Sequence, residues 1–161
     1  MERPYNPDTH YSHDHMLLRQ ELLALSSAQD WEVAKLEWVF VEAYEDETWA
    51  NCLCGHGIKE RCILQNQTTG AKETIGNCCV KKFMPQAIDG EPTDAMFASI
   101  RRVRKSPNKA LHARVIAKAK EQRKITSWAA DWYNHSCRKR ELTVNQFAYR
   151  RNVNRRALAP P

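Results

Sequence analysis

The sequence predicts an α+β protein: a small zinc-bound β-hairpin unit with a flanking N-terminal helix, followed by a basic C-terminal helical bundle. Two strand-like runs separated by a turn indicate the hairpin, and helical spacing of apolar residues indicates the bundle. Five of the six cysteines and four of the five glycines lie between Asn51 and Phe83, which suits a metal-binding turn. We expect an N-terminal unit at residues 1–88 and a basic helical region at 93–161, which could also pack as one compact domain.

The N-terminal segment is expected to be an arm followed by a helix. Residues 1–13 are polar and include two prolines, which predicts a loosely docked arm. His10, His13 and His15 suggest a second metal site, but three histidines in a polar arm without neighbouring cysteines are more often solvated. Asp14 is placed to cap the helix that follows, in which leucines recur at helical spacing.

The next segment changes its periodicity. Residues 35–44 (KLEWVFVEAY) alternate and are rich in aromatic and β-branched side chains, which predicts a strand that ends at the acidic turn 45–47. A helix that continues from Trp31 is the alternative.

A β-hairpin is predicted within the cysteine-rich stretch. Residues 58–66 and 72–75 would be its strands, and Gly70 suits the turn because glycine tolerates a positive φ. A turn centred on residues 68–69 would pair residue 62 with a position near 75. A short helix at residues 78–84 should then follow the second strand.

The cysteines and histidines of this stretch predict a zinc site. Zinc prefers four tetrahedral thiolate or imidazole ligands, and Cys52, Cys54 and His56 alternate around a glycine-containing turn, so they can face one side. The predicted hairpin brings Cys79 back beside this turn and leaves Cys62 roughly 13 Å up the strand. We therefore predict a Zn2+ ion held by Cys52, Cys54, His56 and Cys79, with Cys62 as the reserve ligand.

The predicted zinc is expected to be structural. A catalytic zinc needs an open coordination position and a nearby acid or base. The close carboxylates, Glu60 and Glu73, are expected to face solvent from the strands. Cys78, adjacent to Cys79, has no role that we can assign.

The C-terminal part of the chain predicts helices throughout. The expected helices are residues 94–105, 108–122, 127–138 and 144–158. Ser106 and Pro107 are expected to cap and open the second helix, and Thr126 to cap the third. Thr143 and Gln146 form a predicted capping box at the start of the last.

Charge is divided unequally along the chain. The net charge is +6, but residues 1–92 carry 8 Lys/Arg against 15 Asp/Glu, whereas residues 93–161 carry 17 against 4. A basic segment of this kind is typical of proteins that bind polyanions, most often nucleic acid. A solubilising helical surface, or a basic half that docks on the acidic one, would give the same composition.

The sequence also predicts a cytoplasmic protein with no membrane partner. The N-terminal residues have no apolar signal core, and no stretch approaches the roughly 20 apolar residues that span a bilayer. Thiols stay reduced in the cytoplasm, so clustered cysteines favour a metal over disulfides.

The cysteine-rich stretch also resembles a known group of sequences. Its motifs are C-x-C-G-H-x-I-K-E-x-C at 52–62, N-x-x-T-G at 66–70 and I-G-N-x-C-V-K-K-F at 75–83. They resemble an uncharacterised family of small bacteriophage and bacterial proteins. The resemblance implies a treble-clef-like zinc unit without an agreed activity, with Cys52, Cys54 and Cys79 as ligands and His56 or Cys62 as the fourth.

The favoured function is a non-enzymatic zinc-binding protein that binds nucleic acid through its basic helices. Little sequence specificity is expected, because no known pattern of base-reading side chains is present. Clustered cations at helix ends can contact successive phosphates and release counterions. The predicted nucleic-acid-binding residues are Arg101, Arg102, Arg104, Lys105, Arg138, Lys139, Arg140, Arg150, Arg151, Arg155 and Arg156.

Two other functions compete with this one. A phage-encoded adaptor or inhibitor could bind a host protein, such as a transcription or defence factor, with Trp128, Trp132 and Tyr133 as interface anchors. A nuclease is the enzymatic alternative, but the helix after Gly76 lacks the carboxylate or second histidine that would hold a hydrolytic metal. We therefore expect no enzymatic activity.

Overall fold

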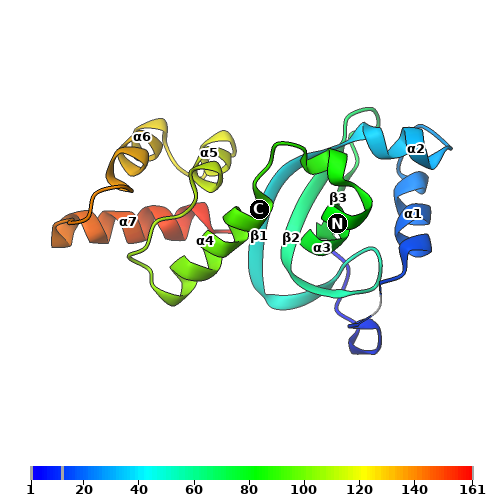
Figure 1. Ribbon diagram of the computed structural model, residues 1–161, viewed down its shortest axis with the longest axis horizontal. Coiled ribbons are helices and arrows are strands. Elements are labelled where there is room, and N and C mark those ends of the chain that lie inside the picture. The colour runs from blue at the N-terminus through cyan, green and yellow to red at the C-terminus, as the bar shows by residue number, and fades with distance from the viewer. Residues whose placement is uncertain (1, 12, 161) are drawn as a thin grey trace. The chain divides into compact units, whose positions relative to one another are not determined.

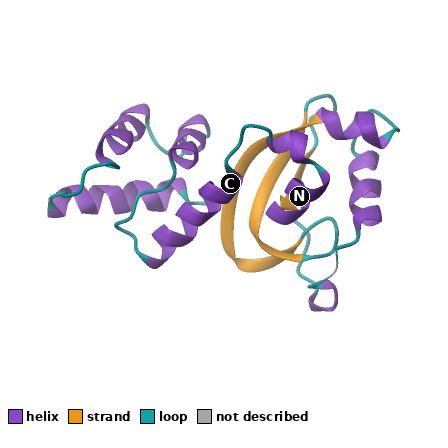
Figure 2. Cartoon of the chain, in the orientation of Figure 1, coloured by secondary structure: helices purple, strands orange, loops and turns teal. Residues whose placement is uncertain are grey.

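The computed structural model describes residues 2–11 and 13–160, and the chain divides into two compact units, Met1–Thr93 and Asp94–Pro161 (Figure 1). The described residues form seven α-helices and one three-stranded antiparallel sheet. All three strands belong to the first unit, whereas the second is built from helices alone (Figure 2). The predicted combination of an antiparallel sheet with helices is thus confirmed.

The sheet consists of β1 (Trp38–Asn51), β2 (Gly57–Asn66) and β3 (Lys72–Gly76) in the order β1-β2-β3. Cys62 pairs with Ile75, so the predicted register of the hairpin is confirmed. Gly70 has a φ of +77° in the turn, and the side chain of Asn66 accepts hydrogen bonds from the backbone N–H groups of Thr68 and Thr69. The turn is therefore stabilised by two local features that can be recognised in the sequence, the glycine at position 70 and the asparagine at position 66.

The first strand differs from the prediction at both ends. Lys35–Glu37 forms a 3-10 helix, and the strand does not stop at the acidic segment but continues to Asn51, with an irregularity between Glu45 and Ala50. The reason is Arg61, which is fully buried on β2, donates to the backbone carbonyl of Thr48 at 2.7 Å and forms ion pairs with Glu2 and Asp46. Arg61 thereby ties Asp46 and Thr48 to β2, so the strand continues past the acidic residues although Glu47 remains exposed.

Two helices precede the sheet. The helix α1 (His15–Ala24) begins at Asp14, whose side chain accepts a hydrogen bond from the N–H of Leu17, as predicted. The helix α2 (Trp31–Ala34) is capped in the same way by Asp30. Leu18 and Leu22 of α1 are fully buried and form part of the core of this unit.

The N-terminal arm is tied to the sheet rather than loosely docked. Arg3 forms an isolated β-bridge with Asn51, and the N–H of Gly57 donates to the carbonyl of His10 at 3.0 Å. The N–H of Asp14 donates to the carbonyl of Cys54, also at 3.0 Å. These bonds place the residues just before α1 beside the cysteine-containing turn.

The helix α3 (Asn77–Phe83) follows β3 directly and packs against β2 and β3. A Cβ atom on Gly76 would lie 2.7 Å from Cγ2 of Ile58, so the helix can start this close to β2 only because residue 76 is glycine. This tight start sets the position of Cys79 within the first turns of α3.

The second unit contains four helices, α4 (Thr93–Lys105), α5 (Ala113–Glu121), α6 (Ser127–Ser136) and α7 (Val144–Ala157). The predicted caps of the last two are confirmed, since Thr126 caps α6 and Thr143 forms a capping box with Gln146 at α7. The prediction for the second helix is wrong at its start: residues 106–112 are not helical, and His112 rather than Ser106 is the N-cap.

Buried polar side chains hold this 106–112 loop open. The side-chain amide of Asn154 donates to the carbonyls of Pro107 and Lys109, and the hydroxyl of Tyr133 accepts from the N–H of Leu111 at 2.8 Å. Tyr133 in turn donates to Asn154. In a helix these N–H and carbonyl groups would bond to one another. Here side chains of α6 and α7 provide their hydrogen bonds instead.

Candidate metal centre

The turn between β1 and β2 presents two sulfur atoms to the same region. The N–H of Cys52 donates to the carbonyl of His56 at 2.8 Å, and the N–H of Gly55 donates to the carbonyl of Cys52 at 2.9 Å. Gly55 has a φ of +86°, which lets the chain reverse here. Backbone N–H groups point at the sulfurs, including that of Gly76, which lies 3.3 Å from the Sγ atom of Cys52.

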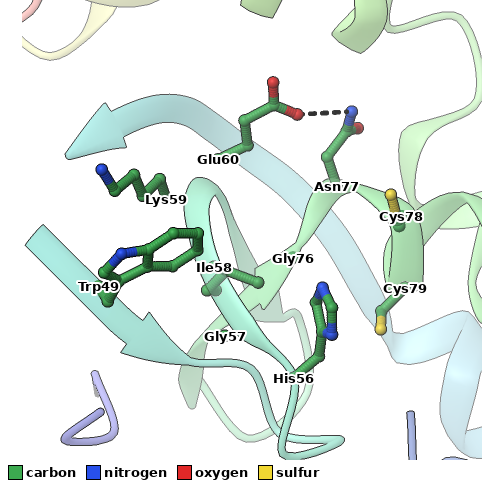
Figure 3. A pocket seen from close by; sticks show the side chains of 10 residues that line it. All are labelled: Trp49, His56, Gly57, Ile58, Lys59, Glu60, Gly76, Asn77, Cys78 and Cys79. Carbon is green, nitrogen blue, oxygen red and sulfur yellow. Dashed lines mark hydrogen bonds between the residues drawn. The ribbon is translucent and has the colours of Figure 1, made fainter. Parts of the chain in front are cut away.

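The third sulfur comes from α3. The Sγ atoms of Cys54 and Cys79 are 3.1 Å apart, although 25 positions separate the two residues. Figure 3 shows that the sulfurs of the adjacent residues Cys78 and Cys79 point in opposite directions. Cys78 is exposed, so α3 contributes Cys79 alone to the cluster.

The arm contributes an imidazole. The Nδ1 atom of His13 lies 3.9 Å from the Sγ atom of Cys54 and 3.7 Å from that of Cys79. The donor atoms of these three residues all lie within 4.8 Å of one another, so the group could hold a metal ion. Cys52 is adjacent, because its thiol is hydrogen-bonded to both Cys54 and Cys79.

The predicted ligands are therefore brought together in part. Cys52, Cys54 and Cys79 converge, whereas His56 lies beside the group of donor atoms and not within it. Its ring stacks on that of His13, with centroids 4.0 Å apart. His13, which the sequence predicted to be solvated, is exposed, but its Nδ1 atom belongs to the group of donor atoms in which His56 was expected.

The reserve ligand lies in the sheet, outside the group of donor atoms. Cys62 is fully buried on β2, paired with Ala43 of β1 and Ile75 of β3, and it is not part of the donor group. Cys137 lies in the second unit, where its thiol donates to the carbonyl of Asn134. No disulfide joins any two cysteines of the described residues.

The three sulfurs cannot all be charged at once without a counter-ion. Hydrogen bonds from the thiols of Cys52 and Cys79 lower the pKa of Cys54 to about 2. The hydrogen bond with Cys54 is the largest cause that raises the pKa of Cys52 to about 11, and the hydrogen bond with Cys52 is the largest cause that raises the pKa of Cys79. The thiols thus shift one another's pKa in opposite directions, and a bound cation would favour loss of their protons.

A cavity of about 230 Å³ lies next to the cluster, lined by residues of β1, β2 and α3 (Figure 3). The Nζ atom of Lys59 sits 4.9 Å from the centroid of the Trp49 ring, and the side-chain amide of Asn77 donates to Glu60 at 3.3 Å. His56 forms part of the wall, and its Nδ1 atom is buried without a hydrogen-bond partner. Burial, with the nearby His13 as a second cause, lowers the pKa of His56 and so favours its neutral form.

The predicted nucleic-acid-binding cations are mostly at the surface of the second unit. Arg150 is an exception and corrects the prediction: only 5% of it is exposed, and it donates to the carbonyls of Asn108 and Ser136. Arg104 is half-buried. The exposed members are Arg101, Arg102, Lys105, Arg138, Lys139, Arg140, Arg151, Arg155 and Arg156.

The three aromatic residues proposed as interface anchors have different environments. Tyr133 is buried in the core, so it cannot serve as an anchor. Trp132 is half-buried and packs edge-on against Tyr149, with centroids 4.6 Å apart. Trp128 is 65% exposed.

Comparisons of the chain with known protein families, with curated proteins and with solved structures gave no significant match. The resemblance to phage and bacterial sequences therefore stays a prediction. Among the helices of residues 2–11 and 13–160, none combines the length and the apolar character that crossing a membrane requires.

Proposed function

We propose that the first unit is a zinc-binding module whose ligands are Cys52, Cys54, Cys79 and His13. Three sulfurs and one imidazole are a donor set that zinc prefers. In a tetrahedral zinc site with these donors, neighbouring sulfurs lie about 3.8 Å apart and a sulfur and a nitrogen about 3.6 Å apart. The distances of 3.7 and 3.9 Å from His13 to the two sulfurs match this, and the 3.1 Å between Cys54 and Cys79 requires only a small separation.

The role proposed for this metal is structural. Four protein ligands would leave no open position for a substrate, which distinguishes a structural from a catalytic zinc. The ligands belong to the arm, the β1–β2 turn and α3, so the metal would join segments that are far apart in the sequence. Its chemistry would be to compensate the thiolates and fix these segments together.

The second part of the proposal is that the helical unit binds nucleic acid with little sequence specificity. The observation that supports it is the set of exposed cations on α4, α7 and the segment after α6. Such side chains can contact phosphates and release counterions, which gives affinity that is independent of sequence.

A salt series tests this part. Binding of the full chain to a random duplex and to a random single strand is measured by fluorescence anisotropy from low to physiological salt. We expect the logarithm of the affinity to fall linearly with the logarithm of the salt concentration, with a slope that counts the phosphates engaged. Absence of binding at low salt would reject the nucleic-acid proposal and leave the zinc proposal intact.

A protein partner is the second candidate function. Trp128 on α6 and Val144 at the start of α7 are large apolar residues that are 65% and 82% exposed. Exposed aromatic residues are common anchors of protein interfaces. If Trp128→Ala leaves nucleic-acid binding unchanged, this surface remains free for such a partner.

A further inference from the structure

A hollow of about 430 Å³ lies within the helical unit, between the 106–112 loop, the segment after α6, and α7. Four cationic side chains line it: Lys109, Lys139, Arg140 and Arg150. None of the described lining residues carries a carboxylate. The hollow is therefore a concave surface of one charge sign, which concentrates positive potential more strongly than a flat patch does.

Arg150 is the buried member of this group, with 5% of its surface exposed. Its two terminal nitrogens donate to the carbonyls of Asn108 at 3.3 Å and Ser136 at 2.7 Å, and its guanidinium lies 5.8 Å from the centre of the Tyr133 ring. Its Nε atom has no hydrogen-bond partner. These partners are neutral, so no carboxylate of the described chain balances the charge.

An unbalanced buried cation is costly, and a bound anion would reduce that cost. The guanidinium is fixed in place by its carbonyl partners and needs no reorganisation to attract an anion. Lys139 and Arg140 are exposed, as is Lys109 across the hollow, so all three are free to reach an anion directly. The hollow thus combines a buried, hydrogen-bonded guanidinium with three exposed cationic side chains around it.

We propose that this hollow is a binding subsite for one phosphate group of a nucleic-acid strand. The inference rests on the proposed nucleic-acid function and adds the place where a phosphate is held most tightly. Phosphate fits better than a carboxylate because it offers oxygens in several directions to cations that approach from different segments. The half-buried ring of Phe147 lines the same hollow and supplies an apolar wall for the attached nucleoside.

The first test uses inorganic phosphate and the full zinc-loaded chain. Backbone amide signals are followed by NMR during a phosphate titration, and we expect saturable shifts concentrated at residues 106–110 and 137–140. The variant Lys139→Gln/Arg140→Gln should lower the affinity for phosphate by at least about tenfold. Arg155→Gln/Arg156→Gln removes the same charge from exposed positions of α7 that do not line the hollow, and it should keep the affinity.

Equal weakening in both variants, or shifts that spread over all basic segments without saturation, would overturn the subsite. A second arm repeats the comparison with a short single-stranded DNA, where the hollow variant should lower the salt slope by about one more than the control does. If DNA binds but the two variants behave alike, the subsite is rejected and the proposed function stands. If phosphate binds at the hollow but DNA does not bind the chain, the strand assignment is rejected and the proposed function fails.

Discussion

The Nδ1 atom of His13 lies 3.7 Å from the Sγ atom of Cys79, although 66 positions separate these two residues. The arm and α3 therefore meet at the cysteines of the β1–β2 turn. Such a donor set is assembled only in the folded chain. The free energy of metal binding would therefore add to the free energy of unfolding. The proposed ligand set can be tested at each of these segments.

The first prediction concerns the imidazole. His13→Ala should lower zinc affinity by at least about 100-fold, because loss of a direct ligand should exceed the 10–100-fold typical of outer partners. Affinity is measured by competition with a chromophoric chelator. His15→Ala is the matched control, since His15 stacks on Phe83 and does not belong to the donor group. If His56→Ala loses the metal and His13→Ala keeps it, His56 is the fourth ligand.

The second prediction concerns removal of the metal. Chelation should lower the melting temperature of the first unit and leave that of the helical unit unchanged, because all proposed ligands lie within Met1–Thr93. Calorimetry with and without a strong chelator provides the measurement. Cys54→Ser should reproduce the chelated state, whereas Cys78→Ser at the exposed neighbouring position should not. Two units that melt together and unchanged would contradict a structural metal.

Local sequence signals predicted much of this fold. The turn at Gly70, the pairing of Cys62 with Ile75, and the caps at Asp14, Thr126 and Thr143 all follow from rules that act over a few residues. The three cysteines of the candidate centre were predicted for the same reason. Their spacing around a turn and a following helix leaves few arrangements.

The features that were missed depend on contacts between distant segments. Residue type and composition do not distinguish His13 from His10 or His15, and its place follows from the hydrogen bond between Asp14 and Cys54, 40 positions later in the chain. A signal was available: His13 directly precedes the N-cap of a helix, where the chain is held in a defined conformation.

The basic helices illustrate the same limit. Arg150 looks like its neighbour Arg151 in the sequence, and only packing of α7 against the 106–112 loop makes one buried and the other exposed. The same packing explains why Ser106 and Pro107 do not open a helix. Composition identifies a cationic segment, but it cannot assign each cation to surface or core.

The third prediction follows from this difference. Arg150→Gln should destabilise the helical unit by about 2 kcal/mol, because the buried carbonyl of Ser136 and the part-buried carbonyl of Asn108 lose their donor, while relief of the unbalanced charge offsets part of the cost. Arg155→Gln, at an exposed position of the same helix, should stay within about 0.5 kcal/mol. Urea unfolding monitored by circular dichroism compares the two. Equal effects would show that the contacts of Arg150 add nothing to stability.

The fourth prediction concerns alkaline pH. Burial, the largest cause, raises the pKa of Tyr133 to about 12 from a normal value of 10.0. In the unfolded chain the hydroxyl ionises near pH 10, whereas in the folded chain it stays protonated until about pH 12. Its contribution to stability is therefore fully present below pH 10 and is lost as the pH rises toward 12, which amounts to roughly 3 kcal/mol for a shift of this size.

Tyr133→Phe isolates this effect, since both proteins share every other titrating group. At neutral pH the variant should be less stable, because the N–H of Leu111 and the side chain of Asn154 lose their partner. Between pH 10 and 12 the difference should shrink, since phenylalanine does not ionise. Urea unfolding of both proteins across this range gives the measurement. Parallel loss of stability in the two would show that Tyr133 ionises normally in the folded chain and that its hydroxyl is not held by the 106–112 loop.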